Sequence, residues 1–297
     1  MKHELTLAIP YYSGFALFEQ TLRSLAGQRV LVVDDSPRGL SRDELAIIAR
    51  LVDARVLRNA TNLGMARSWN RCLDEASTDL VTIVHADDLL APGYAARVVE
   101  LAEAFDAPAV FTGARVIGSS GSDVFSVPDL VKRALVPRHH GALELRGDAG
   151  LAALMRGNFI FCPSLCFRRS RMTLRFDPRW RFMLDMHLTV RLLLAGESLV
   201  GVPEEPLYLY RRHADNATAR LTAELTRFRE EHAFYREVTA EAAARGLTRA
   251  AEVAGRERMI QLNLAFCIAR DLAGFRLRDG AEKARLFGDL FVRQRMS

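Results

Sequence analysis

The sequence predicts an α/β fold in which helices cover both faces of a largely parallel, doubly wound sheet. From residue 5 to about residue 116, short apolar segments alternate with amphipathic ones, as strands and helices do in such folds. The apolar segments are continuous, as in "VLVV" at residues 30–33, which is typical of strands buried on both faces. Aspartate pairs follow two of these strands, at residues 34–35 and 87–88. Doubly wound sheets bind ligands beyond the carboxyl ends of their strands, so these pairs indicate where a site lies.

The first 116 residues divide into strands and helices in order. Continuous apolar runs predict strands at residues 5–9, 30–33, 55–57, 80–84 and 110–112. Apolar residues at helical spacing predict helices at residues 15–25, 40–51, 65–76 and 92–105. The last of these helices opens at Pro92, because proline is well tolerated in a first helical turn.

The pattern breaks between residues 113 and 147, where turn-rich segments predict a long flexible loop. A short helix or hairpin within it stays open, and such loops often serve as lids or binding loops. Regular structure resumes with a strand at 159–167, a helix at 184–195 and a strand at 207–210. After residue 222 the pattern predicts two or three amphipathic helices that run to the end.

Composition places the chain among globular proteins with a substantial core, since 49% of its 297 residues are hydrophobic and 26% are charged. The net charge is +5, and all but three of the 41 basic residues are arginines. A GC-rich genome explains this bias most simply, while a surface for phosphate or anionic lipid stays open. We expect no nucleic-acid partner. Four scattered cysteines and the lack of a long apolar segment favour a cytoplasmic protein with reduced thiols.

The stretch "VLVVDDSP" resembles the strand with paired magnesium-binding acids in response-regulator receiver domains. Three features count against that class. A strand and a helix precede the stretch, whereas a receiver begins with it. His85 stands where the phosphoacceptor aspartate would end the later strand, and Lys132 does not follow a strand as a receiver's lysine does. A receiver-like phosphoacceptor domain stays as a minor alternative.

Six motifs in order resemble those of inverting family 2 glycosyltransferases, which have the GT-A fold. They are "LAIPYYSGFALFEQTLRSLAGQ", "VLVVDDSP", "NLGMARSWNRCLDEAS", "LVTIVHADDLLAPG", "FMLDMHLTVRLLLAGE" and "LYLYRRHADNAT", and they cover roughly residues 5–216. The resemblance implies a GT-A domain over residues 1–220 and a C-terminal helical extension over 221–297. Within the domain, residues 1–116 would form the nucleotide-sugar-binding half and residues 117–220 the acceptor-side half.

The resemblance also implies which residues bind the donor. Asp35 would accept a hydrogen bond from a pyrimidine ring, while Asp34 is the more structural of the pair. The turn at residues 62–64 would let the backbone approach the nucleotide, because glycine has no side chain and a helix N-terminus favours phosphate. The nucleotide-sugar-binding residues implied are Pro10, Tyr12, Asp35, Asn62, Gly64, Arg67, Asp87 and Arg211.

A divalent cation is implied by the family's Asp-x-Asp motif, which appears here as His85-Ala86-Asp87-Asp88. His85 replaces the first aspartate. Asp88 and His213 are the implied ligands, and whether Asp87 or Asp88 ligates directly stays open. Oxygen ligands and a diphosphate suit manganese or magnesium, which would offset the charge that builds on the leaving nucleoside diphosphate.

On the acceptor side, Asp185 matches the general base of the family's Glu-Asp motif, with Leu184 in place of the glutamate. An inverting transfer needs one carboxylate to take the proton of the attacking hydroxyl. The stretch "NFIFCPSLCFRRS" resembles the segment that lines the acceptor pocket, and Asn158, Pro163 and Ser164 are its implied acceptor-binding residues.

Together these motifs imply a metal-dependent, hexosyltransferase-like enzyme that transfers a sugar from a UDP- or dTDP-sugar. The acceptor would be a hydroxyl of a saccharide, a lipid-linked glycan or a natural product, as in cell-envelope polysaccharide biosynthesis. A catalytically inactive nucleotide-binding or scaffold relative stays open because of His85 and Leu184. For the C-terminal helices, a cap on the catalytic domain is the first interpretation. A homodimer contact is the second, and peripheral contact with the inner face of a membrane is the third.

Overall fold

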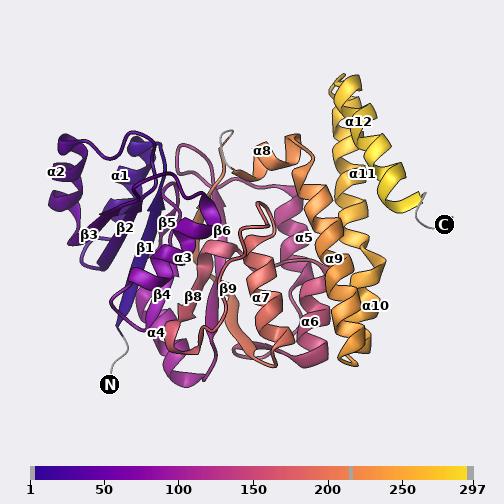
Figure 1. Cartoon of the computed structure of the whole chain (residues 1–297), viewed down its shortest axis with the longest axis horizontal. Helices are drawn as coiled ribbons and strands as arrows, with labels where there is room; N and C mark the ends of the chain where they lie inside the picture. The colour runs from indigo at the N-terminus through magenta and orange to yellow at the C-terminus, as the bar shows by residue number, and fades with distance from the viewer. Residues whose placement is uncertain (1–3, 214–216, 293–297) are drawn as a thin grey trace.

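The computed structural model describes residues 4–213 and 217–292. In these residues a single mixed sheet runs through the molecule, helices flank it, and a group of C-terminal helices packs at one end (Figure 1). The sheet has nine strands: β1 (Leu5–Tyr11), β2 (Arg29–Asp34), β3 (Ala54–Arg58), β4 (Leu80–Ile83), β5 (Leu89–Leu90), β6 (Ala109–Ile117), β7 (Leu143–Arg146), β8 (Leu165–Arg168) and β9 (Ser198–Arg211). Their order is β3-β2-β1-β4-β8-β6-β9-β5, and β7 also pairs with β9.

The first four strands in this order form the parallel half of the sheet, in which β1 lies between β2 and β4. The other half is mixed, because β8 runs antiparallel to both β4 and β6 while β6 and β9 are parallel. The predicted α/β class with helices on both faces is confirmed. Chain segments from residues 143–211 add antiparallel strands to this sheet.

Helices cover both faces because side chains alternate along each strand. Leu7 and Ile9 of β1 face a cluster with Phe18 and Ile48, whereas Ala8 between them faces the cluster that contains Trp69. The first face is covered by α1 (Phe15–Ser24), α2 (Arg42–Leu51) and α4 (Tyr94–Ala104). The second is covered by α3 (Met65–Glu75), α6 (Gly147–Arg156) and α7 (Leu184–Leu194).

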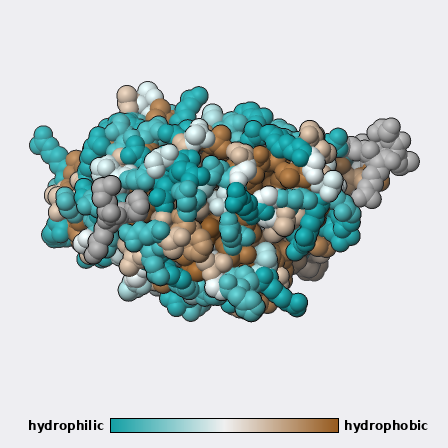
Figure 2. Space-filling view, turned by 90° about the horizontal axis from the view of Figure 1, so that it is seen from below, coloured by the Kyte–Doolittle hydropathy of each residue, from teal (hydrophilic) through white to brown (hydrophobic). Residues whose placement is uncertain are grey.

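The C-terminal helices continue the second cluster outward, so they pack on the sheet's helical layer and not on the sheet itself (Figure 1). They are α8 (Ala217–Ala223), α9 (Thr226–Ala244), α10 (Thr248–Arg256), α11 (Arg258–Ala273) and α12 (Leu277–Phe287), followed by a π-helical turn at Gly288–Val292. Phe228 and Phe234 of α9 and Leu264 of α11 are buried in this cluster. None of the helices in the described ranges is long and apolar enough to cross a bilayer. Seen from below, hydrophobic patches lie towards the middle of the molecule, divided by hydrophilic residues (Figure 2).

The predicted long loop at residues 113–147 is wrong in part. β6 continues to Ile117, because it pairs with the far end of β9, and α5 (Val127–Leu135) and β7 follow. α5 is amphipathic, but none of its residues is fully buried, so its apolar side chains do not mark a face that packs in the core. The predicted strand at 159–167 is shorter, since a 3₁₀ turn at Cys162–Ser164 precedes β8.

Candidate active site

Asp35 lies just beyond β2, and both of its carboxylate oxygens are bonded inside the protein. Oδ1 accepts from Asn59 Nδ2 at 2.6 Å and from the Leu63 amide at 2.7 Å. Oδ2 accepts from Asn62 Nδ2 at 3.0 Å and from the Gly64 amide at 3.1 Å. A carboxylate has about four lone-pair sites, and four donors fill them. Asp35 therefore holds the turn at residues 62–64, and a base could reach its carboxylate only by displacing one of these donors.

The neighbouring Asp34 is structural, as the sequence predicted. Its Oδ1 accepts from the amide and hydroxyl of Ser36 at 3.0 and 2.5 Å, and its Oδ2 accepts from the Leu40 amide at 2.8 Å. It thereby folds the loop after β2 back on itself. The acidic pair braces two different loops at the carboxyl edge of the sheet.

The turn that Asp35 holds opens directly onto the N-terminus of α3. Gly64 has φ +77°, a conformation that other residues rarely adopt, and open space lies where its Cβ would be. Arg67 is exposed on the first turn of the same helix. Tyr12, at the end of β1, is 54% exposed, and Pro10 is partly buried in the strand. These four residues therefore line an accessible rim, while Asn62 is bonded to Asp35.

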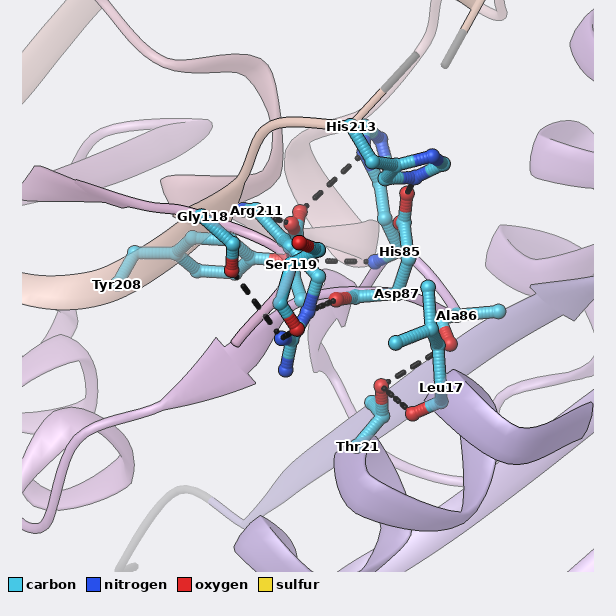
Figure 3. A network of polar contacts seen from close by, with 11 residues as sticks. Leu17, Thr21, His85, Ala86, Asp87, Gly118, Ser119, Tyr208, Arg211 and His213 are labelled. Atoms are coloured by element: carbon cyan, nitrogen blue, oxygen red, sulfur yellow. Dashed lines mark hydrogen bonds and ion pairs between the residues drawn. The ribbon is translucent and has the colours of Figure 1, made fainter. Parts of the chain in front are cut away.

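Asp87 and His213 meet across the same edge of the sheet, from opposite ends of the sequence (Figure 3). His213 Nε2 lies 2.7 Å from Asp87 Oδ2, and both side chains are partly exposed. A carboxylate oxygen beside an imidazole nitrogen is a donor set that fits Mn²⁺ or Mg²⁺ at a diphosphate. His85, Asp87 and Asp88 also form a group in which one ligand atom of each lies within 4.8 Å of the others.

Asp88, in contrast, is completely buried. Its Oδ2 accepts from the Tyr208 hydroxyl at 3.0 Å and its Oδ1 accepts from the Arg211 amide at 2.6 Å. Burial, and after it the charge of Asp87, raises the pKa of the Asp88 carboxyl well above its usual value. Asp88 is therefore a buried carboxyl that accepts hydrogen bonds on both oxygens from residues of β9, and it stabilises the end of that strand. The geometry therefore favours Asp87 over the predicted Asp88 as the accessible partner of His213.

The structure also contradicts the prediction that Arg211 binds the donor diphosphate. Arg211 is only 1% exposed, and its guanidinium donates four hydrogen bonds. Figure 3 shows it beside Asp87, Gly118 and Ser119. The acceptors are the Asp87, Gly118 and Ser119 carbonyls and the Gln20 side chain, at 2.7, 3.3, 2.8 and 3.0 Å. Four of five N–H groups are therefore used inside the protein. Arg211 ties the end of β9 to the loop that carries Asp87, and it does not face a ligand.

His85 lies between the two halves of the site. Its ring stacks on Trp69 at 5.5 Å between centroids, and its Nδ1 is 3.5 Å from Asp88 Oδ2. Its Nε2 is a buried nitrogen without a hydrogen-bond partner among the described residues. Burial lowers the pKa of His85, while the charges of Asp87 and Asp185 oppose that shift. His85 is therefore within electrostatic range of both the predicted metal motif and the predicted base.

Asp185 begins α7 and points to the acceptor side. Asn158 Nδ2 donates to Asp185 Oδ2 at 3.3 Å, so two predicted residues meet here. Burial raises the pKa of Asp185, and the charge of Lys132 is the largest opposing influence. A carboxylate with a raised pKa, held by one amide, has the chemistry of a general base.

Pro163 and Ser164 do not line an acceptor pocket as predicted. Ser164 is completely buried, its hydroxyl donates to the Phe161 carbonyl, and its own carbonyl accepts from Tyr94. Pro163 is buried in the same 3₁₀ turn. Both residues shape the turn that positions Phe161, because a 3₁₀ turn needs its polar groups satisfied locally where it is buried.

Lys132 was not predicted as a site residue. It lies on α5 with its Nζ 4.0 Å from the centroid of the Phe161 ring, and it is within electrostatic range of Asp185. One signal was available in the sequence: lysine is almost absent from this arginine-rich chain, with Lys2, Lys132 and Lys283 its only examples. Nothing in the sequence placed α5 over the site.

The chain matches the model of a known protein family. The family model described as glycosyl transferase family 2 matches residues 6–171, which is more than half of the chain. The chain belongs to this family. The matched residues include the parallel half of the sheet, the Asp35 turn and the His85–Asp88 motif.

The chain is also similar to a curated protein and to solved structures. The uncharacterized protein MT1568 of Mycobacterium tuberculosis (strain CDC 1551 / Oshkosh) is 36% identical over 114 residues, which cover 36% of this chain and 34% of that protein. The match thus spans about a third of the relative's length. TarS 1–349 of S. aureus in complex with UDP-GlcNAc has a TM-score of 0.55 at 15% identity, covering 81% of this chain and 66% of that chain.

A second solved structure covers nearly the whole chain. The mannosyltransferase PcManGT from Pyrobaculum calidifontis, in complex with GDP-Man and Mn²⁺, has a TM-score of 0.57 at 17% identity, over 99% of this chain and 82% of that one. At such identities the likeness establishes the fold, which is the GT-A glycosyltransferase fold with C-terminal helices. The predicted family and enzyme class are therefore confirmed.

Proposed function

We propose that this family 2 glycosyltransferase moves a sugar, with inversion, from a nucleoside-diphosphate sugar to an acceptor hydroxyl. The observation that carries the proposal is the placement of Asp185, partly accessible and raised in pKa, within electrostatic range of His85 at the predicted metal motif. A base on one side and a diphosphate site on the other leave the anomeric carbon between them, as a single displacement requires.

On the donor side, the exposed rim of Tyr12, Gly64 and Arg67 would receive the nucleotide. Asp87 and His213 would hold a divalent cation, which neutralises charge on the leaving diphosphate. UDP or dTDP is the proposed carrier. TarS 1–349 was solved with UDP-GlcNAc and PcManGT with GDP-Man and Mn²⁺, so nucleotide sugars are the ligands of proteins with this fold.

On the acceptor side, Asp185 would take the hydroxyl proton as that oxygen attacks. Asn158 donates to one carboxylate oxygen, and the backbone N–H groups at the start of α7 also bond this carboxylate, which fixes its position. We propose a saccharide, lipid-linked glycan or natural product as acceptor and a role in cell-envelope polysaccharide synthesis at the cytoplasmic side. Homodimer and peripheral membrane contacts through the C-terminal helices stay predictions.

The Asp185→Asn variant tests the base. We expect transfer to fall by about 10²–10⁴-fold, the usual contribution of a positioned general base, while donor binding stays within about twofold. Calorimetric titration with UDP, dTDP and GDP, each with and without Mn²⁺, measures binding. Asp53→Asn, an exposed carboxylate remote from the site, is the matched control. Unchanged transfer by Asp185→Asn, or no nucleotide binding by folded protein, would point instead to the scaffold alternative.

A further inference from the structure

Lys132 is held over the acceptor side of the site by a helix anchored at both ends. At the start of α5, Arg212 donates to Asp129 Oδ1 at 2.9 Å and to the Ser126 hydroxyl at 2.9 Å. At its end, Leu135 packs so closely on Gly157 that a Cβ there would lie 2.6 Å from Leu135 Cδ1. The position of Lys132 is therefore set by the fold.

The ammonium group of Lys132 lies beside the residues that orient the base. Its Nζ is 4.0 Å from the centroid of Phe161, whose ring is 5.8 Å from that of Tyr210. Phe161 follows Asn158 by three residues, and Asn158 bonds Asp185. Lys132 is thus in contact with the segment that bonds Asp185, and it lies within electrostatic range of the Asp185 carboxylate.

This ammonium has no hydrogen bond or ion pair with any residue in the described ranges; its contact is with the Phe161 ring. The carboxylate of Asp129 is occupied by Arg212 and Ser126, and Asp185 is bonded by Asn158. A cation–π contact contributes about 0.5–2 kcal/mol and uses none of the N–H donors. Within the described residues no protein atom accepts from these three donors, and solvent reaches the ammonium.

The charged groups around Lys132 explain its protonation. Burial lowers the pKa of Lys132 to about 8, with Asp185 and Asp129 opposing the shift and Arg227 and Arg212 adding to it. At neutral pH it is mostly a cation. If Lys132 served only to offset Asp185, a direct ion pair would do so more strongly, yet no such pair forms.

We propose that Lys132 binds an anionic group of the acceptor, a phosphate or a carboxylate carried near the hydroxyl that is glycosylated. The inference rests on the proposed function, in which Asp185 is the base. Either anion offers several oxygens to the three unused N–H donors. The acceptor class is thereby narrowed to sugars or alcohols that bear such a group.

The scarcity of lysine makes a direct test possible. Selective ¹³C labelling of the lysine Cε positions gives only three side-chain signals, and every ammonium keeps its charge and its three N–H donors. With the donor site saturated by UDP and Mn²⁺, glycerol phosphate and glucuronate are titrated separately, and glucose is the neutral control. We expect the Lys132 signal to shift saturably with at least one anion and not with glucose. Lys283, which pairs with Asp271 at 2.7 Å, should not move.

Variants give a second, independent readout by thermal denaturation. We expect the anion to stabilise the wild type and Arg133→Met, an exposed neighbour on the same helix, to the same extent. Lys132→Met should weaken anion binding about tenfold or more, since a charge-assisted hydrogen bond is lost. Lys132→Arg should keep part of the affinity. If Lys132→Met does not fold, the titration of the lysine Cε signals in the wild type decides.

The outcomes separate this proposal from the proposed function. A Lys132 signal that moves with UDP and Mn²⁺, and not afterwards with either anion, would make Lys132 a donor residue and overturn the proposal. A signal that ignores both anions would overturn it too, even if Asp185→Asn abolishes transfer. If the anion response is intact while Asp185→Asn keeps full transfer, the assignment of the base fails instead. Response to glycerol phosphate alone, or to glucuronate alone, identifies which anion the acceptor carries.

Discussion

Two cationic side chains, Arg211 and Lys132, flank the site, and they differ in how many hydrogen bonds they donate within the protein. Arg211 on the donor side is buried and donates four of its five N–H groups to the Asp87, Gly118 and Ser119 carbonyls and to Gln20. Lys132 on the acceptor side lies over an aromatic ring and, within the described residues, donates to none. Sequence position suggested the reverse, since Arg211 stands next to His213 in a family motif.

The difference teaches that nearness to a motif does not make a charge available. Arg211 stabilises the loop that presents Asp87, so it acts on the site through the backbone. A guanidinium suits this role, because it offers donors in several directions in one plane. An ammonium whose N–H donors have no acceptor in the protein is available to bind an anion. In the donor half, the Arg211 guanidinium is hydrogen-bonded within the protein and stabilises the fold. In the acceptor half, the Lys132 ammonium has no acceptor among the described residues.

The difference between the two side chains is tested most directly by the free energy of unfolding of Arg211→Met and of Lys132→Met. We expect Arg211→Met to lower the free energy of unfolding by about 3 kcal/mol or more, because it leaves buried carbonyls unpaired. Lys132→Met should change it by less than about 1 kcal/mol, since no hydrogen bond is lost. Urea denaturation of both variants measures the difference. Equal losses would mean that Lys132 is as structural as Arg211.

A smaller effect is expected at the pair that would hold the cation. His213→Ala should weaken Mn²⁺-dependent UDP binding by about 10–100-fold, while binding without metal changes little, because imidazole serves as a ligand and not as a nucleotide contact. Calorimetry with Mn²⁺, and again after chelation with EDTA, measures this. The equivalent loss with Asp88→Asn, and none with Asp87→Asn, would return the ligand assignment to Asp88.

How much the sequence predicted also differs between the halves. On the donor side, most parallel strands are largely apolar runs, so the positions of the strands and of Asp87 after one of them follow from local patterns. What the sequence could not give was the partner of each polar group. Asp35 and Arg211 look available in one dimension, and only the fold brings Asn59 and Gln20 to them.

On the acceptor side, the sequence predicted Asp185 and Asn158 as site residues, but it did not predict that α5 and Lys132 lie near them. α5 owes its position to contacts with Arg212 and Gly157, which are 83 residues and 22 residues away from their partners on the helix. Its exposed face carries Val127, Leu130 and Val131, so the apolar residues of the helix do not mark the face that packs on the rest of the protein. Ser164 was misplaced because a 3₁₀ turn, not a strand, aims its hydroxyl back at Phe161.

The smallest expected effect is in the pH dependence of transfer. Burial raises the pKa of Asp185, and the Lys132 charge holds that pKa lower than burial alone would. A base must be ionised, so kcat/KM for the acceptor falls as pH drops through the Asp185 pKa. Lys132→Met removes the opposing charge, so this acidic limb should move to higher pH. Arg133→Met, the control, should leave it in place.

The other described groups within electrostatic range of Asp185 are present in the wild type and in Lys132→Met alike, so the difference between the two pH profiles reports the loss of the ammonium. Burial lowers the pKa of His85 and raises the pKa of the Cys162 thiol well above its usual value, so both are neutral near pH 7. Lys132 is then the charge whose loss the acidic limb reports. An acidic limb that stays fixed in Lys132→Met would show that the ammonium and the base are not coupled. The unpaired charge would then act on the acceptor alone, through binding and not through the proton transfer.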